Sequence, residues 1–184
     1  LTQSTYLGGA LGDFAFALGI HPLNGEIYLA GHTDSTDFPG VAGGAQANRG
    51  GGIRDGYVSR LSADLSALTQ STYLGGANDD VAWALTFRQE SDEVYVTGET
   101  YSTDFPSTTG GTQATLSAVV DAFIGRLNTN LTTLIQATYV GGANGDVTRA
   151  IAIHPLRDEV YVAGDANSLD FPGVTGGAQS ASGI

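Results

Sequence analysis

Apolar and polar residues alternate along short stretches of this chain. Between residues 14 and 20, the apolar side chains Phe14, Phe16, Leu18 and Ile20 occupy every second position. An alternation of period two is typical of a β-strand that buries one of its faces. The same kind of segment returns at 81–87 ("VAWALTF") and 147–153 ("VTRAIAI"). We therefore predict a strand with one buried face at each of these three places.

Three further kinds of strand-like segment follow the first kind, each bounded by Gly, Pro, Asn or Asp. Together the four kinds predict eleven strands. The second kind is "EIYLAG", which begins at 26 and has copies at 93 and 159. The third is "DGYVSRL", which begins at 55 and has a copy at 121. The fourth is "LTQSTYL", which begins at 1 and has copies at 68 and 134. No segment keeps apolar residues at i, i+3, i+4 and i+7 over three turns, so the fold class expected is all-β.

The four segments form a unit that repeats. Tyr6, Tyr73 and Tyr139 recur at steps of 67 and 66 residues, and the phrase "TYLGG" or "TYVGG" surrounds each of them. We expect one domain over 1–184 with repeats of approximately 1–67, 68–133 and 134–184, the last incomplete. The paired glycines allow the chain to turn sharply, so this phrase is predicted to leave the outer strand of one unit and begin the next.

Repetition at this length favours a β-propeller built of four-stranded antiparallel blades. A single four-stranded sheet cannot bury both faces, whereas identical neighbours stacked side by side can. The eleven strands amount to about 2.75 blades, and a closed propeller needs at least about four. Two alternatives follow: the chain is a segment of a longer polypeptide, or copies of it assemble to complete the propeller.

The repeated motifs resemble the SBBP repeat family, the seven-bladed β-propeller repeats of bacterial and archaeal secreted and cell-surface proteins. The residues that carry the resemblance are "STYLGG" at 4 and 71, "EVYVTG" at 93, "STDFP" at 35 and 102, and "DAFIGRLN" at 121. "SLDFP" at 168 and "DGYVSRLS" at 55 depart slightly from the pattern. The resemblance covers essentially the whole chain. It implies a propeller in a secreted or cell-surface protein, and it implies no particular chemistry.

The charge of the chain restricts its partners. Seven basic and 19 acidic residues give a formal net charge of −12, which disfavours nucleic acid and anionic lipid surfaces. No apolar run approaches the roughly 20 residues that span a bilayer, so no membrane insertion is expected. The chain contains no cysteine, which excludes disulfides and thiolate chemistry. Free carboxylates leave Ca²⁺ as a possible cofactor, although solubility alone also explains an acidic surface.

Positions at which the repeats disagree are the candidates for ligand binding, because what every unit needs for folding should be shared. Two equivalent sets differ strongly in side-chain chemistry. They are Phe16, Trp83 and Arg149 on the first strand, and His32, Glu99 and Asp165 just after the second. Aromatic and charged side chains near a channel mouth could stack on and hydrogen-bond a sugar or a peptide. The alternative is that the two aromatic rings pack between units and that the remaining differences are drift.

Aspartates at the start of the first strand are the candidates for a metal site. Asp13, Asp80 and Asp146 are equivalent, and Asp79 beside Asp80 makes the densest carboxylate pair. Calcium binds hard oxygen ligands of this kind, but the spacing fits no EF-hand loop. The alternative is that these aspartates, and Asp37, Asp104 and Asp170 of the "DFP" motif, accept backbone N–H groups at turns.

These features favour a non-catalytic extracellular propeller module for binding or cell-surface assembly, with a glycan or a protein as its ligand. The sequence has no GxSxG motif and no Ser-His-Asp arrangement, and we assign no catalytic residue. The alternative is a carbohydrate-active propeller enzyme that uses carboxylates at the channel mouth. A third, purely structural role would join copies through unpaired strand edges.

Overall fold

The computed structural model describes residues 2–182 and contains ten strands there. Leu1 and residues 183–184 lie outside the described part. Two four-stranded antiparallel sheets and one two-stranded sheet are formed. Their strands are β1 (Asp13–Ile20), β2 (Ile27–Thr33), β3 (Asp55–Leu61) and β4 (Leu68–Leu74); β5 (Asp80–Phe87), β6 (Val94–Thr100), β7 (Asp121–Leu127) and β8 (Leu134–Val140); and β9 (Asp146–Ile153) and β10 (Val160–Ala166).

Each sheet is a meander, in which strands follow one another in space in the order of the chain. The expectation of an all-β protein is confirmed, and ten of the eleven expected strands are present within a residue or two of their expected bounds. No helix in residues 2–182 is long and apolar enough to cross a membrane.

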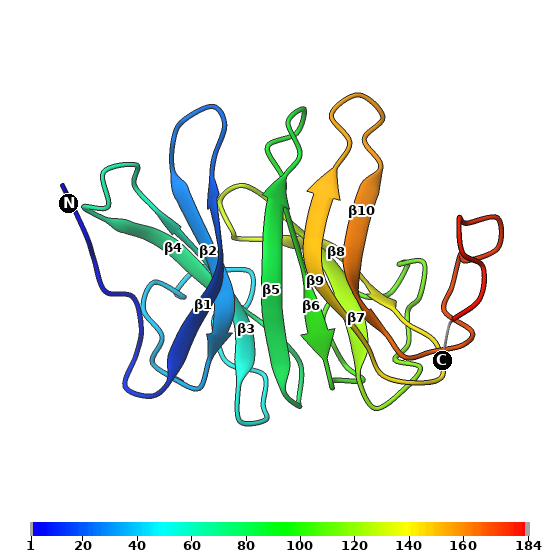
Figure 1. Cartoon of the computed structure of the whole chain (residues 1–184). Helices are drawn as coiled ribbons and strands as arrows, with labels where there is room; N and C mark the ends of the chain where they lie inside the picture. The colour runs from blue at the N-terminus through cyan, green and yellow to red at the C-terminus, as the bar shows by residue number, and fades with distance from the viewer. Residues whose placement is uncertain (1, 183–184) are drawn as a thin grey trace.

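The three sheets stack in a row along the chain. Strand β5 packs against β1, β2 and β3 of the first sheet, and β9 packs against β5, β6 and β7 of the second. Figure 1 places β1, β5 and β9 side by side, with the two chain ends on opposite sides of the molecule. The main core draws buried side chains from both complete sheets, among them Tyr28, Val58, Val96 and Phe123. The sheets do not close on themselves.

The repeated Gly-Gly phrase forms the corner between sheets. Strand β4 ends at Leu74, and Gly75 and Gly76 lead to β5 at Asp80 in the next sheet. The expected role of this phrase as the link between units is therefore confirmed. The space beside both glycines is occupied: a methyl group built on Gly76 would lie 2.5 Å from Asp104 Oδ1. A side chain at the corner would displace the groups that hold it.

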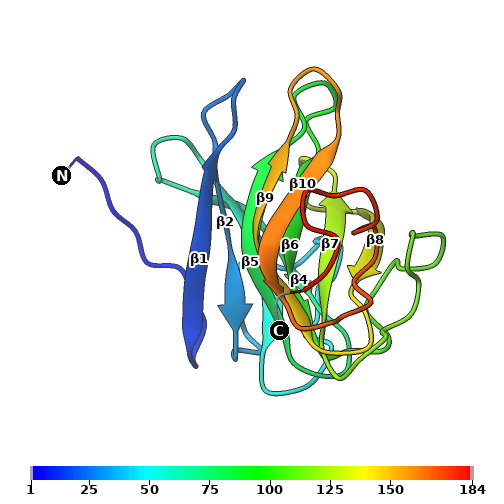
Figure 2. The same ribbon diagram turned by 45° about the vertical axis from the view of Figure 1, so that its right-hand side comes forward.

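The first expected strand, residues 1–7, is not a strand in its described part. Residues 2–9 have no regular structure, and Figure 2 shows this segment extending away from the sheets. In the complete sheets the fourth strand pairs only with the third, as β4 pairs with β3. Within residues 2–182 this segment pairs with no strand.

The prediction of a buried face on the first strand is wrong for β1. Leu18 and Ile20 are each 63% exposed, because no sheet formed by residues 2–182 lies on that side of the first sheet. Their equivalents Leu85 and Phe87 in β5 are half-buried and lie against Gly19 of the first sheet. The alternation therefore identifies the strand correctly, while burial depends on whether another sheet stands beside it.

Candidate functional site

A β-bulge interrupts the first strand of every sheet. In the first sheet Ala15 pairs with Gly31 and Ala17 with Ala30, which leaves Phe16 without a partner residue. The register skips Trp83 of β5 and Arg149 of β9 in the same way. A bulge redirects the side chain of the extra residue. The variable set on the first strand, Phe16, Trp83 and Arg149, is therefore the set of bulge residues.

A glycine opposite each bulge allows the two strands to approach. A methyl group on Gly31 of β2 would lie 1.8 Å from the carbonyl oxygen of Phe14, and one on Gly98 of β6 would lie 1.8 Å from that of Val81. No side chain can occupy that space. These glycines close the "EIYLAG" and "EVYVTG" motifs, so the repeated motif fixes the bulge, and the bulge fixes the direction of the variable residue.

The bulge residues and their neighbours form one continuous row, which we call the bulge row. The ring centroids of Phe16 and Trp83 lie 4.3 Å apart, and Arg149 Cζ lies 4.8 Å from the centre of the Trp83 ring. Asp165 Oδ2 accepts a hydrogen bond of 2.8 Å from Arg149 Nε. At the other end the His32 ring lies 5.4 Å from that of Phe16. The row therefore crosses all three sheets.

Phe14 extends the row beyond what the sequence predicted. Its ring lies 4.8 Å from that of His32, its partner in the β1–β2 register. The equivalents of Phe14 are Val81 and Val147. The repeats therefore differ at this position too, and this difference could have marked Phe14 as a candidate. Glu99, in contrast, is half-buried, and its side chain forms no hydrogen bond or ion pair within residues 2–182. The structure joins five of the six expected ligand-binding residues by direct contacts, and Glu99 stands on the middle sheet at the position equivalent to His32 and Asp165.

The row combines exposed rings with an exposed ion pair, Arg149 and Asp165. Phe14 is 51% and Phe16 is 41% exposed, and Trp83 is half-buried. Trp83 Nε1 and His32 Nδ1 are buried and have no hydrogen-bond partner among the described residues. Burial, with help from the nearby positive charge of Arg54, lowers the pKa of His32 and so favours the neutral ring. Arg149 contributes a positive charge to the row.

The three equivalent aspartates of the expected metal site hold the corners of the fold. Gly9 N, Gly76 N and Gly142 N donate to Asp13, Asp80 and Asp146 over 2.7, 2.8 and 2.8 Å. The "DFP" aspartates act beside them, since Ala77 N donates to Asp104 Oδ1 over 2.9 Å. In these contacts the aspartates accept backbone N–H groups at turns, as the alternative interpretation of the sequence expected.

Asp79 also has protein partners. Its Oδ1 accepts from Ile53 N over 2.7 Å, and its Oδ2 accepts from Arg54 Nε over 3.3 Å. Burial opposes the ionisation of Asp79, but the hydrogen bonds from Ile53 and Arg54 together hold its pKa below the usual value. Among residues 2–182, no three His, Asp or Glu side chains come together as a metal-binding group. The calcium site stays a prediction.

A second aspartate at each corner was not predicted from the sequence. A methyl group on Gly75 would lie 2.6 Å from Asp80 Oδ2 and 3.0 Å from the carboxyl carbon of Asp55, so two buried carboxyls meet there. Burial raises the pKa of Asp55 to about 6 and that of Asp80 to about 7, and the charge of Asp55 adds to the second shift. Asp121 and Asp146 meet around Gly141 in the same way. These pairs belong to the joints between sheets.

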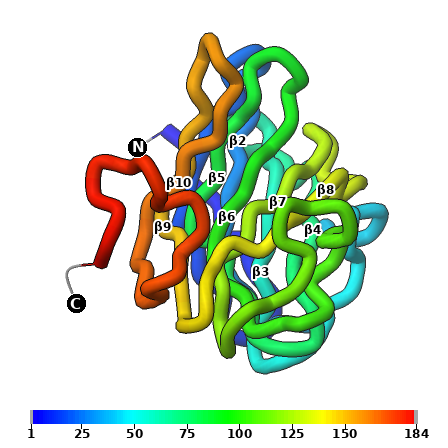
Figure 3. The backbone as a smooth tube through the Cα atoms, turned by 90° about the vertical axis from the view of Figure 1, so that its right-hand side faces the viewer, coloured from blue at the N-terminus to red at the C-terminus, as the bar shows by residue number. Residues whose placement is uncertain are grey.

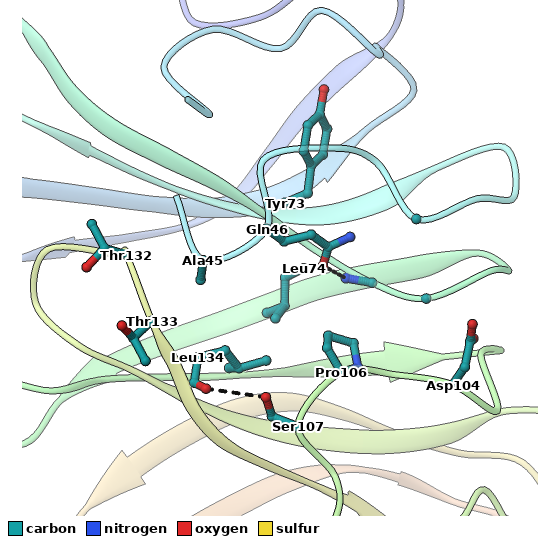
Figure 4. A pocket seen from close by; sticks show the side chains of 13 residues that line it. Ala45, Gln46, Tyr73, Leu74, Asp104, Pro106, Ser107, Thr132, Thr133 and Leu134 are labelled. Carbon is teal, nitrogen blue, oxygen red and sulfur yellow. Dashed lines mark hydrogen bonds between the residues drawn. The ribbon is translucent and has the colours of Figure 1, made fainter. Parts of the chain in front are cut away.

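A separate hollow lies between the outer edges of the two complete sheets, and Figure 4 shows its lining. It measures about 420 Å³. Its polar side chains are already engaged in the fold: Gln46 Oε1 accepts from Gly75 N, and Ser107 Oγ donates to the carbonyl of Leu134. We therefore favour the bulge row over this hollow as the ligand site.

No protein-family model matches the chain, and no curated protein is significantly similar to it in sequence.

Proposed function

We propose that the three sheets are successive blades of a β-propeller of the SBBP-repeat type, and that the chain is a non-catalytic extracellular binding module. The repeat of four-stranded meanders stacked in a row supports the architecture. The first strand of each sheet is then the innermost one, and the side chains of the bulge row line the axis. A secreted or cell-surface location is part of this proposal and rests on the family resemblance.

The bulge row is the single observation that carries the binding proposal. Every sheet builds the same bulge with the same opposing glycine, but each places a different side chain on it. A fixed backbone that presents variable side chains is suited to recognition. Arg149 and Asp165 are 49% and 61% exposed at the end of this aromatic row, where a ligand can reach them.

A glycan is the ligand class that this chemistry fits. Phe14 and Phe16 are 51% and 41% exposed and Trp83 is half-buried, so part of this aromatic surface is open to the apolar face of a sugar. Arg149 and Asp165 supply donors and acceptors for hydroxyl groups within reach of the same rings. The net charge of −12 favours a neutral or basic glycan over an acidic one. A protein surface is the second ligand class, and the test below separates the two.

Trp83 makes the proposal directly measurable, because it is the only tryptophan of the chain. We expect neutral oligosaccharides, titrated into the protein, to change its fluorescence in a saturable way. Trp83→Phe keeps a ring, and its binding, followed by calorimetry, should be weaker. Arg149→Ala should weaken binding about tenfold through lost charge-assisted hydrogen bonds.

Tyr101→Phe serves as the matched control, since Tyr101 is an exposed aromatic residue outside the row. It should bind like the wild type. Equal loss of binding in Tyr101→Phe and Arg149→Ala would argue against the row as the site. Saturable binding of a protein partner, with no response to any glycan of a broad panel, would replace the glycan with a protein ligand. Release of reducing sugar during the titration would overturn the non-catalytic assignment.

A further inference from the structure

A second hollow lies at the joint between the two complete sheets, and we call it the joint hollow. It measures about 450 Å³ and is lined by Gly52, Ile53, Arg54, Asn78, Asp79 and Tyr101. These residues belong to the loop before β3, to the corner that leads into β5 and to the loop after β6. All the residues that line the hollow therefore come from the two complete sheets and from the corner that joins them.

The joint hollow is open to solvent at one end of the molecule. Figure 3 shows the turn between β5 and β6 and the turn between β9 and β10 at the top of the view. The hollow lies next to Asp80, where β5 begins, and therefore at the opposite end of this strand. Ile53 is 71% and Tyr101 is 39% exposed. A ligand in solvent can therefore contact an aliphatic and an aromatic side chain there.

The backbone at this joint is held by a hydrogen bond that does not depend on the arginine side chain. Asp80 N donates to the carbonyl of Arg54 over 3.0 Å. At the equivalent joint between the second and third sheets, Asp146 N donates to the carbonyl of Val120 over 3.3 Å. The same backbone bond thus forms with an arginine or with a valine, so the fold does not require the guanidinium group of Arg54.

Two other side chains of the joint hollow are also replaced at the equivalent joint. Gly145 stands at the position of Asp79, and Asn167 stands at the position of Tyr101. The two joints therefore share their backbone bond and differ in the side chains around it. A frame that the fold fixes, with side chains that the fold does not need, is suited to binding a ligand.

Arg54 brings a guanidinium group with free donors to the joint hollow. Its Nε donates to Asp79 Oδ2 over 3.3 Å, whereas its Nη1 and Nη2 form no hydrogen bond or ion pair within residues 2–182. The Arg54 side chain is 42% exposed. Asp79 is fixed in turn, because its Oδ1 accepts from Ile53 N over 2.7 Å. Asp79 therefore orients the guanidinium group and leaves its two terminal nitrogens free.

These free donors and the side chains beside them indicate the chemistry of the ligand. The two terminal N–H groups of a guanidinium match the two oxygens of a carboxylate, and such charge-assisted bonds are stronger than those to a neutral acceptor. Ile53 and Tyr101 offer apolar contact to the rest of the same molecule. The net charge of −12 opposes anions, so one carboxylate with direct contact to Arg54 is favoured over several.

We propose that the joint hollow binds an organic monocarboxylate with an apolar body, whose carboxylate is held by Arg54 Nη1 and Nη2 and whose body lies against Tyr101. The carboxylate can belong to a free acid or to the C-terminal residue of a peptide. Because the site is open and the protein is acidic, we expect a dissociation constant of about 1 mM. No lining residue of the hollow belongs to the bulge row, and this proposal does not depend on glycan binding.

A titration of the whole chain with phenylacetate, followed by amide chemical shifts in NMR spectra, tests the site. We expect saturable shifts concentrated at Gly52, Ile53 and Asn78. Arg54→Gln keeps a polar side chain, removes the charge, and should weaken binding about tenfold. Arg157→Gln is the matched control, because Arg157 Nε also lies 3.3 Å from a carboxylate oxygen, that of Glu159, but outside the hollow. It should bind phenylacetate like the wild type.

Related compounds separate the parts of the proposal. Phenylacetamide, which lacks the charge, and acetate, which lacks the ring, should each bind about tenfold more weakly than phenylacetate. A peptide with a free C-terminal phenylalanine that binds more tightly than phenylacetate would identify a peptide end as the source of the carboxylate, and weaker binding would identify a free acid.

Three results would overturn the proposal. They are equal binding of phenylacetate and phenylacetamide, equal loss of binding in Arg54→Gln and Arg157→Gln, and the absence of saturable shifts at the joint hollow. Neutral oligosaccharides should leave the amide signals of Gly52 and Ile53 unchanged while they alter Trp83 fluorescence. The failure of carboxylate binding and the failure of glycan binding are therefore seen separately.

Discussion

The buried aspartates at the corners of the fold act as partly protonated acids. Asp80 is fully buried and accepts from Gly76 N and Ser102 Oγ, while Asp55 approaches it from the neighbouring sheet. Burial and this second carboxyl oppose ionisation and raise the pKa of Asp80, so the folded protein holds its proton to about pH 7. The unfolded chain releases the same proton near pH 4. The two states therefore bind different numbers of protons between these values.

The first prediction is a loss of stability as the pH rises from about 4 to about 7. In this window the unfolded state binds fewer protons at Asp55 and Asp80 than the folded state, so the free energy of unfolding falls with pH. Asp80→Asn, whose amide stays neutral, should flatten this dependence. Urea unfolding at pH 5 and pH 8 measures it.

The control for this experiment is Asp64→Asn. Asp64 is fully exposed, and hydrogen bonds from Ser62 and Ser66 lower its pKa to about 2. Its substitution should leave the change between pH 5 and pH 8 as it is in the wild type. If Asp80→Asn also left the difference in the free energy of unfolding between pH 5 and pH 8 intact, the protonation of Asp80 would not be the cause of that difference.

At the level of single elements, the bulge depends on the glycine opposite to it. The second prediction is that Gly98→Ala destabilises the protein by about 3 kcal/mol or more, because the new methyl group would collide with the backbone carbonyl of Val81. Chemical denaturation measures the loss. Gly125→Ala is the matched control: it lies on β7, its nearest neighbour is a side-chain methyl at 3.3 Å, and the equivalent position in β3 is Ser59. Equal losses in the two variants would show that the bulge tolerates a side chain.

The joint between the fourth strand and its loop gives the third prediction. Tyr139→Phe removes a hydroxyl that bonds Ser102 O and Phe105 N, and both backbone groups would stay buried without a partner. We expect a loss of about 2 kcal/mol in the free energy of unfolding. Tyr6→Phe should leave the free energy of unfolding unchanged, because Tyr6 is fully exposed. A loss of similar size in Tyr6→Phe would contradict the exposure of this segment.

At the level of the whole molecule, the acidic surface leads to the fourth prediction. If Ca²⁺ binds at the Asp79 corner, millimolar Ca²⁺ should raise the melting temperature and a chelator should reverse the rise, because a ligand of the native state stabilises it by mass action. Asp79→Asn should abolish the shift. Magnesium at the same concentration is the control for general screening of the net charge of −12. Equal shifts with the two ions, or none, would count against the site.

Much of the fold and part of the candidate site followed from the sequence. The alternation and the repeat predicted the strands, their order and the corner glycines, because these depend on local backbone geometry and on what each unit shares. Disagreement between repeats selected Phe16, Trp83, Arg149, His32 and Asp165 as candidates for ligand binding, and the structure joins them in one row of contacts. It also selected Glu99, whose side chain forms no hydrogen bond or ion pair within residues 2–182, and it passed over Phe14, whose position alone did not reveal its contact with His32.

Only the tertiary structure decided which side chains of the repeated segments are buried. Leu18 and Leu85, or Tyr6 and Tyr73, are equivalent in sequence, yet one of each pair is exposed and the other is not. The pairing of Asp55 with Asp80 was equally hidden, because it joins two sheets across residues far apart in the repeat. Local sequence sets the conformation of a strand, whereas burial and pKa depend on the neighbour that stacking brings beside it.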